Sequence, residues 1–170
     1  MIDGYLLDTN AGSILWDKRH RNYPQIRAFL KNVASSPVLI STVVLAEVEY
    51  GLKIATKMDM NRQNDVRNEM AKFPLVLDID RHTITPYSDL RSELFKNYSP
   101  RDRRGRLILK WPEDLVDQTT AKELGVQEND IWIAAQAIQY NLVLVTDDHM
   151  VRLEEVSKSL NYPLIIANWK

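Results

Sequence analysis

Residues 128–148 constrain the fold more strongly than any other stretch of this 170-residue chain. Residues 131–138 are rich in alanine and isoleucine and follow Asn129 and Asp130, which predicts an amphipathic helix opened by an Asn/Asp cap. After a short polar break, residues 142–145 read Leu-Val-Leu-Val, which is typical of a strand buried on both faces. A helix joined in this way to a buried strand predicts an α/β fold.

The lengths of this helix and strand predict where their polar ends lie. A helix of about eleven residues covers roughly 16 Å, and a strand of about six residues covers roughly 20 Å in the opposite direction. Asp130 precedes the helix, and Asp147 and Asp148 follow the strand. We therefore expect these three acids at the same edge of a sheet.

Short apolar runs alternate with helical patterns along the rest of the chain. Strands are predicted at residues 5–7, 38–40, 75–77 and 164–166. Helices are predicted at residues 11–18, from Pro24, from Val43 past Ile54, at 61–73 and at 81–96, with Thr9 or Asn10 as the first cap. This alternation favours a three-layer α/β/α sandwich with a mainly parallel central sheet. We expect one domain, residues 1–170, interrupted by an irregular basic insert at about residues 99–118.

Composition narrows the classes of function. The chain has no cysteine, so disulfides, thiol catalysis and cysteine-based zinc sites are excluded. No segment has the pattern of a signal peptide and no apolar run reaches membrane-spanning length, so a cytoplasmic protein without a membrane partner is expected. The net charge of −1 gives no global attraction to nucleic acid, so any such contact needs a local basic surface or a metal ion.

Acidic residues follow the predicted strands, where ligands bind in open α/β sheets. Asp8 follows the first strand, and Glu47 lies just over one turn into the helix after the second. Together with Asp130 and the Asp147–Asp148 pair, these acids are expected to converge. Clustered carboxylates repel one another without cations, and Mg²⁺ or Mn²⁺ is their natural partner. Such a site activates water and holds a phosphate oxygen.

Each acid also has a structural interpretation. Asp130 alone is more typical of a helix cap than of a ligand, Asp8 is compatible with a cap, and the Asp147–Asp148 pair with a turn. Glu47 differs because its helical neighbours include Val43, Val44, Tyr50 and Gly51, which predicts a carboxylate on an apolar row that only a salt bridge or a ligand compensates. Four short polar residues at the same edge are interpreted as partners that orient the acids or as caps: Thr9, Asn10, Thr42 and Thr146.

Other chemistries have little support. The three histidines (His20, His82 and His149) show no metal-binding spacing, and His149 is expected to be exposed. The five glycines form no phosphate-cradling loop. The insert is basic, and its charges form either a solvated loop or a clamp on a phosphate backbone: Arg101, Arg103, Arg104, Arg106 and Lys110.

Four motifs occur in an order that resembles PIN-domain ribonucleases, in particular the VapC-type toxins of bacterial toxin–antitoxin pairs. They are Tyr-Leu-Leu-Asp-Thr-Asn at 5–10, Ser-Thr-Val-Val-Leu-Ala-Glu at 41–47 with Gly51, Asn-Asp-Ile-Trp-Ile-Ala-Ala at 129–135 and Leu-Val-Thr-Asp-Asp at 144–148. The resemblance covers nearly the whole chain, and the ordered set is far more specific than any one motif.

The resemblance implies a compact α/β/α sandwich that hydrolyses RNA phosphodiester bonds with water activated by Mg²⁺ or Mn²⁺. It assigns Asp8, Glu47, Asp130 and Asp148 as metal-binding and catalytic residues, with Asp147 as the alternative fourth acid. It also implies a homodimer that a VapB-like antitoxin silences. Two alternatives stay open from the residues alone: another metal-dependent phosphate enzyme, such as a phosphatase or phospho-acceptor domain, and a non-catalytic binding module.

Overall fold

The computed structural model describes residues 2–57, 59–148, 150–162 and 164–170. Within these residues the core is a parallel sheet with strand order β3-β2-β1-β4-β5. Its strands are β1 (Gly4–Leu7), β2 (Val38–Ser41), β3 (Val76–Leu77), β4 (Leu142–Val145) and β5 (Ile165–Ala167). The predicted α/β fold with a parallel central sheet is confirmed.

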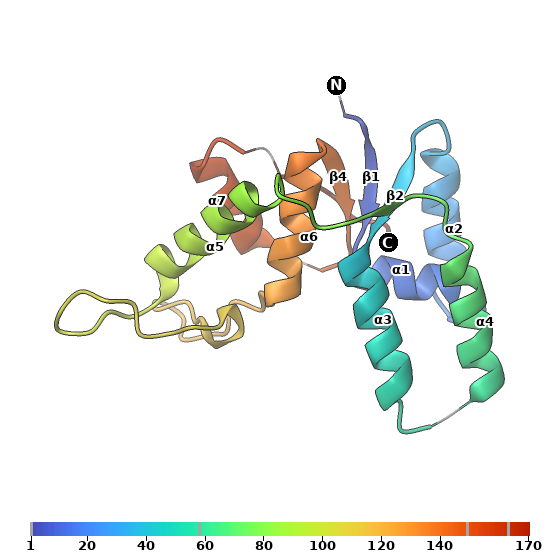
Figure 1. The fold of residues 1–170 in the computed structure, drawn as a ribbon, viewed down its shortest axis with the longest axis horizontal. Helices are drawn as coiled ribbons and strands as arrows, with labels where there is room; N and C mark the ends of the chain where they lie inside the picture. Colours follow the sequence, from blue (N-terminus) through green and yellow to red (C-terminus); the bar gives the residue numbers. More distant parts are fainter. Residues whose placement is uncertain (1, 58, 149, 163) are drawn as a thin grey trace.

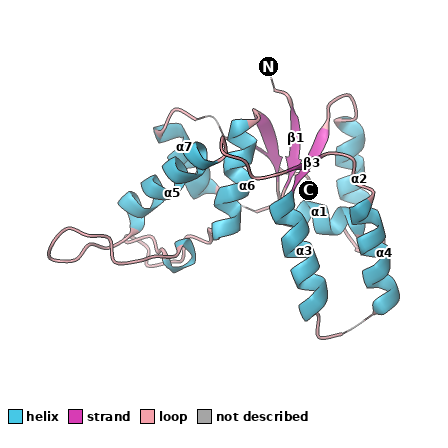
Figure 2. Cartoon of the chain, viewed as in Figure 1, coloured by secondary structure: helices cyan, strands magenta, loops and turns pink. Residues whose placement is uncertain are grey.

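Helices cover both faces of the sheet. They are α1 (Thr9–Trp16), α2 (Tyr23–Asn32), α3 (Thr42–Ile54), α4 (Met60–Ala71), α5 (Ile84–Tyr98), α6 (Glu128–Gln139) and α7 (Val151–Ser159). Helices α1, α2 and α4 gather on one side, and α5, α6 and α7 gather on the other (Figure 1). Helices α3 and α4 form a hairpin that projects beyond the sheet (Figure 2).

The middle strands place the polar residues that follow them at one edge. Leu7, the last residue of β1, pairs with Val145, the last residue of β4, and with Ile40 in β2. The backbone N–H of Asp8 donates to the Val145 carbonyl at 3.0 Å, so the chain leaves β1 beside the end of β4. All four residues of β4 are buried, as its apolar run predicts, because helices cover both faces.

The structure corrects both predicted helix starts at this edge. The N-cap of α1 is Asp8 rather than Thr9 or Asn10, and its carboxylate accepts the Ala11 N–H at 2.7 Å. The N-cap of α6 is Gln127, which places Asp130 at the third helical position instead of at the cap. In α1 the Asp8 side chain accepts an otherwise unpaired N–H of the first turn, and in α6 the Asp130 side chain accepts the Gln127 N–H.

Two further segments differ from expectation. Helix α7 is absent from the sequence-based assignment because its polar face is broad and only Leu153, Val156 and Ser157 are buried. The segment predicted as irregular at about 99–118 contains, among its described residues, a single 3₁₀ turn at Pro112–Asp114, and the irregular chain, which includes two isolated antiparallel bridges, extends beyond it to residue 127. Within the described part of the chain, no helix combines the length and apolar character needed to span a membrane.

Candidate metal centre

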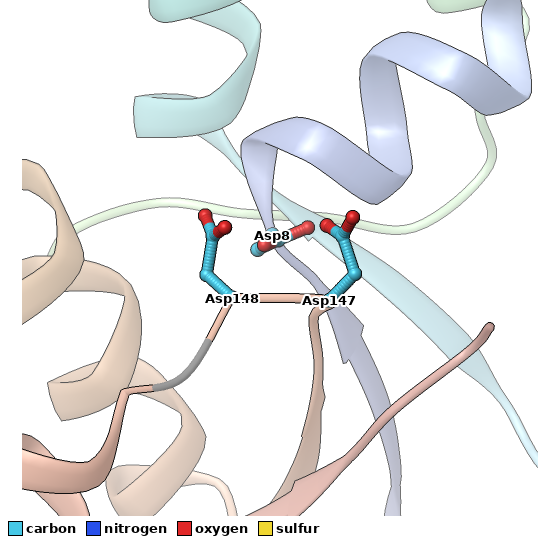
Figure 3. Close-up of side chains that lie close together, drawn as sticks. All are labelled: Asp8, Asp147 and Asp148. Carbon is cyan, nitrogen blue, oxygen red and sulfur yellow. The ribbon is translucent and has the colours of Figure 1, made fainter.

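Three aspartates converge at the carboxyl edge of β1 and β4. Asp8, Asp147 and Asp148 each offer a carboxylate oxygen, and these oxygens lie within 4.8 Å of one another. Asp147 and Asp148 come after β4 with only Thr146 between, and their carboxylates project to the same side, with Asp8 between them (Figure 3). The predicted meeting of Asp8 with the Asp147–Asp148 pair is confirmed.

Asp8 is the most buried acid of the cluster, with 3% of the residue exposed. The pKa of Asp8 is raised from 3.8 to about 7, mainly by burial and also by the charges of Asp148 and Asp147, against hydrogen bonds from Thr146 and Ala11 that lower it. A carboxyl group of this kind resists ionisation unless a positive charge compensates it. Asp8 therefore caps α1, and its ionised form lowers the stability of the folded protein when no cation compensates the charge.

Asp130 has the same two properties. Its Oδ2 atom accepts the Gln127 N–H at 2.7 Å as half of a capping box. Burial raises the pKa of Asp130 to about 6, and the charges of Glu47, Asp148 and Glu113 raise it too. These interactions connect the start of α6 to the cluster, with Asp148 acting on both Asp8 and Asp130.

Glu47 is half-buried on α3 and both of its oxygens accept hydrogen bonds. Oε2 accepts from the Thr9 hydroxyl, and Oε1 accepts from the Asn129 amide at 2.8 Å. The apolar row expected around Glu47 is found only on its N-terminal side, where Val44 is fully buried, because Tyr50 is 64% exposed and Gly51 has no neighbour that a Cβ atom would contact within 4 Å. Helix α3 runs past the sheet, so this face lines a groove instead of packing into the core.

The structure distinguishes the two acids of the Asp147–Asp148 pair. Asp147 accepts a hydrogen bond from the Asn10 amide and forms an ion pair with Lys170. The Asp148 side chain forms no hydrogen bond or ion pair with any described residue, while its backbone N–H donates to the Thr146 hydroxyl at 2.9 Å. Asp147 is therefore engaged by protein donors and Asp148 is available to a ligand.

The short polar residues predicted at this edge also fall into two groups, those that contact an acid and those that do not. Thr9, Asn10 and Thr146 contact acids of the cluster, as expected of orienting partners. Thr42 forms no side-chain hydrogen bond with a described residue, and Ser41 caps α3 in its place. His149, expected to be exposed, lies outside the described residues.

Sequence reasoning missed two polar neighbours of the acids. Asn129 belongs to a quoted motif, but its bond to Glu47 depends on how α3 meets α6. Lys170 lies 22 positions beyond Asp148 in a segment without a recognisable motif. Lys170 comes near Asp147 because β5 pairs with β4.

Among the described residues, the part of the basic insert that contacts α5 and the start of α6 is its C-terminal part, which includes Lys110 and Glu113. Glu113 accepts the N–H of Glu128 at 2.9 Å, and Arg91 of α5 donates to the Lys110 carbonyl at 2.7 Å and pairs with Glu128 at 3.1 Å. The distal part of the insert extends away from the sheet (Figure 1). There, Arg106 pairs with Asp102 at 3.0 Å and Arg101 donates to the Gly105 carbonyl at 2.8 Å.

The donor set fits a hard divalent cation. Mg²⁺ binds oxygen at about 2.1 Å, so two oxygens on opposite sides of one ion lie about 4 Å apart. The oxygens of Asp8, Asp147 and Asp148 lie within 4.8 Å, close to that separation. The raised pKa values of Asp8 and Asp130 describe carboxyl groups whose charge lacks compensation from the protein alone.

Comparison with known proteins agrees with this geometry. The family model for the PIN domain matches residues 5–158. The chain belongs to the PIN-domain family. This PIN domain is 26% identical over 166 residues to ribonuclease VapC2 of Rickettsia felis, and the match covers 97% of each chain.

Solved structures share the fold over the full length. A chain in the crystal structure of VapBC2 from Rickettsia felis bound to a DNA fragment from their promoter has a TM-score of 0.62 and 24% identity, with 100% of both chains covered. A chain in the DNA-bound VapBC structure from Salmonella typhimurium has a TM-score of 0.65 and 20% identity, again with 100% of both covered. FitAcB from Neisseria gonorrhoeae matches with a TM-score of 0.62 and 19% identity over 97% of each chain.

Proposed function

We propose that this PIN domain is a divalent-cation-dependent endoribonuclease and the toxin of a VapBC-type toxin–antitoxin pair. The observation that carries the proposal is the carboxylate cluster at the edge of β1 and β4, where Asp8, Asp147 and Asp148 lie within 4.8 Å. The likeness to ribonuclease VapC2 over 97% of both chains supports the same activity.

Mg²⁺ or Mn²⁺ is the proposed cofactor, with Asp8 and Asp148 as its primary ligands. Asp8 is buried and rigidly held by its bond to the Ala11 N–H, whereas Asp148 is exposed and free of protein donors. When bound, the cation supplies an activated water and an electrophilic contact for a phosphate oxygen. Asp147 contributes negative charge to the same site.

Asp130 and Glu47 complete the proposed set of acids. Oδ1 of Asp130 accepts no hydrogen bond from a described residue, so it is available while Oδ2 caps α6. The Asn129 and Thr9 donors hold Glu47 in one orientation. Burial raises the pKa of Asp130, and a bound divalent cation would favour the ionised carboxylate that burial disfavours, which suits a metal ligand.

A VapB-like antitoxin is the proposed partner, by analogy with the VapBC complexes. A groove of about 440 Å³ lies between α1, α3 and α4, and both Thr9 and Glu47 line it. Its floor is apolar through Val48, Leu52 and Val66, while His20, Lys57 and Arg62 lie on its walls. An extended or helical segment of the antitoxin in this groove reaches the acids directly.

We further propose that RNA contacts the basic insert. The Arg103, Arg104 and Lys110 side chains are exposed and form no ion pair with a described residue, so their charges are available to phosphates. Trp111 is 60% exposed beside Lys110 and offers a surface on which a base stacks. A homodimer, as the resemblance implies, stays a prediction that light scattering tests.

The decisive experiment compares the wild-type protein with Asp8→Asn. Total RNA is incubated with each protein and Mg²⁺ or Mn²⁺, and the new 5′ ends are mapped by sequencing. The wild-type protein is expected to cut at defined sites, and Asp8→Asn is expected to lose cleavage and growth arrest while retaining its circular dichroism spectrum.

Asp65→Asn is the matched control, because Asp65 forms a surface ion pair with Arg19 at 3.2 Å and is 66% exposed. It should cut at the wild-type sites. Cleavage by Asp8→Asn at the wild-type rate, or wild-type cleavage that persists in EDTA, contradicts the proposal.

A further inference from the structure

A lysine side chain that is itself 52% exposed pairs with one acid of the cluster. Nζ of Lys170 forms an ion pair with Oδ2 of Asp147, whose side chain is only 6% exposed. The other oxygen of Asp147, Oδ1, accepts from the Asn10 amide. Both oxygens of Asp147 are therefore occupied, although the residue lies within 4.8 Å of its acidic neighbours.

The fold holds Lys170 at this position. Strand β5 pairs with β4 so that Ala167 lies beside Val145, and the Thr146 N–H donates to the Ala167 carbonyl at 3.1 Å. Trp169 is 3% exposed and anchors the segment that follows β5. The side chain of Asn168 accepts the Lys170 N–H at 2.8 Å, and the ammonium lies 5.5 Å from the Trp169 ring centroid.

These contacts oppose a bound cation in two ways. An ammonium group beside Asp147 repels a divalent ion bound at the cluster, and solvent screens this repulsion only in part because Asp147 is nearly buried while the Lys170 side chain is 52% exposed. The ion pair also competes for the oxygen that Asp147 would otherwise give to the metal. Asp148, with no protein partner among the described residues, has no such competitor.

We propose that Lys170 is a positioning residue that keeps Asp147 out of the metal's ligand set and lowers the affinity of the site for divalent cations. The inference rests on the proposed function, since it concerns the same metal site. Lys170 thereby makes Asp148 the ligand that follows β4, and it offsets one unit of the negative charge gathered there.

The test measures binding of Mn²⁺ alone by calorimetry, without RNA. Lys170→Met keeps much of the side-chain volume and removes the charge, so it is expected to bind Mn²⁺ about tenfold more tightly than the wild-type protein. Lys170→Arg restores a cation and should stay within about twofold of the wild type. In an Asp147→Asn background the effect of Lys170→Met should shrink to about twofold, because Lys170 has then lost its anchor.

Lys158→Met is the matched control, because Lys158 pairs with Glu154 at 2.7 Å on the surface of α7. Its Mn²⁺ affinity should equal that of the wild type. If the wild type binds Mn²⁺ and Lys170→Met binds it no more tightly, this inference is overturned and the proposed function stands. If neither protein binds Mn²⁺, both are overturned.

Discussion

The buried charge of Asp8 predicts that a loss-of-function substitution stabilises the metal-free protein. Asp8 has a pKa of about 7 in the folded protein against 3.8 when unfolded. Between these two values the folded protein binds more protons than the unfolded chain, so stability falls as pH rises through this window. The difference of about 3 pKa units, at roughly 1.4 kcal/mol each, corresponds to about 4 kcal/mol lost by pH 8.

Asp8→Asn removes this charge and keeps the cap, because asparagine is as good an N-cap as aspartate. In EDTA at pH 8 the variant is therefore expected to be more stable than the wild type by up to about 4 kcal/mol, or about 10 °C in Tm. At pH 5 the advantage should fall below about 2 kcal/mol, because little of the window has been crossed.

Urea denaturation followed by tryptophan fluorescence, at pH 5 and pH 8 in EDTA, measures both values. Asp65→Asn, on the surface, should show no comparable rise in stability at pH 8. Adding Mn²⁺ should stabilise the wild type more than Asp8→Asn, because the ion compensates the Asp8 charge. The reasoning is refuted if Asp8→Asn is less stable than the wild type at pH 8, or if the difference between them does not change with pH.

Three further predictions concern the other polar groups. Asp148→Asn should weaken Mn²⁺ binding, measured by calorimetry, more than Asp147→Asn does, because Asp147 is already paired with Lys170; equal losses would contradict the division of roles. Glu47→Gln should lower the pKa of Asp130 from about 6, as read from its carboxyl NMR shift in EDTA, because one repelling charge is gone; an unchanged titration would show that burial alone sets the value. Replacing Arg103 and Arg104 together with alanine should weaken RNA binding and reduce its salt dependence by about one unit for each lost phosphate contact, measured by fluorescence anisotropy; an unaltered salt slope would exclude the insert from the RNA interface.

The central part of the fold follows directly from local sequence. The Leu-Val-Leu-Val run of β4 has no polar side chain, so it is stable only between two helical layers. The register that pairs Leu7 with Val145 then places Asp8 beside the acids after β4. This is why the meeting of Asp8, Asp147 and Asp148 could be predicted from strand endings alone.

Details that depend on side-chain geometry could not be predicted in this way. The cap of α1 lies one or two residues, and that of α6 two or three residues, before the expected position, because the Asp8 carboxylate accepts the Ala11 N–H and the Asp130 carboxylate reaches back to the Gln127 N–H. The surroundings of Glu47 depend on how far α3 extends beyond the sheet, which helical periodicity does not report. Helix α7 was missed because few apolar residues mark its buried face.

Asp130 shows why the structural and functional interpretations of an acid need not compete. Its Oδ2 atom completes the capping box of α6, so the cap fixes the position of the carboxylate. Oδ1 accepts no hydrogen bond from a described residue, and the negative charges of Glu47 and Asp148 help to raise the pKa of the Asp130 carboxyl group. In the proposed metal site, a helix cap would thus hold a ligand in one position, both for Asp130 at α6 and for Asp8 at α1.

The pairing of β4 with β5 explains why Lys170 lies beside the acids that follow β4. Val145 lies beside Ala167, so the two segments leave the sheet together and the residues two or three positions further on, Asp147 and Lys170, come within reach. The segment that follows a neighbouring parallel strand can therefore contact acids that follow the first strand, even when the two segments are far apart in sequence. Here that segment contributes Lys170, and the proposed competition between Lys170 and a divalent ion for Asp147 would follow from the order of the strands.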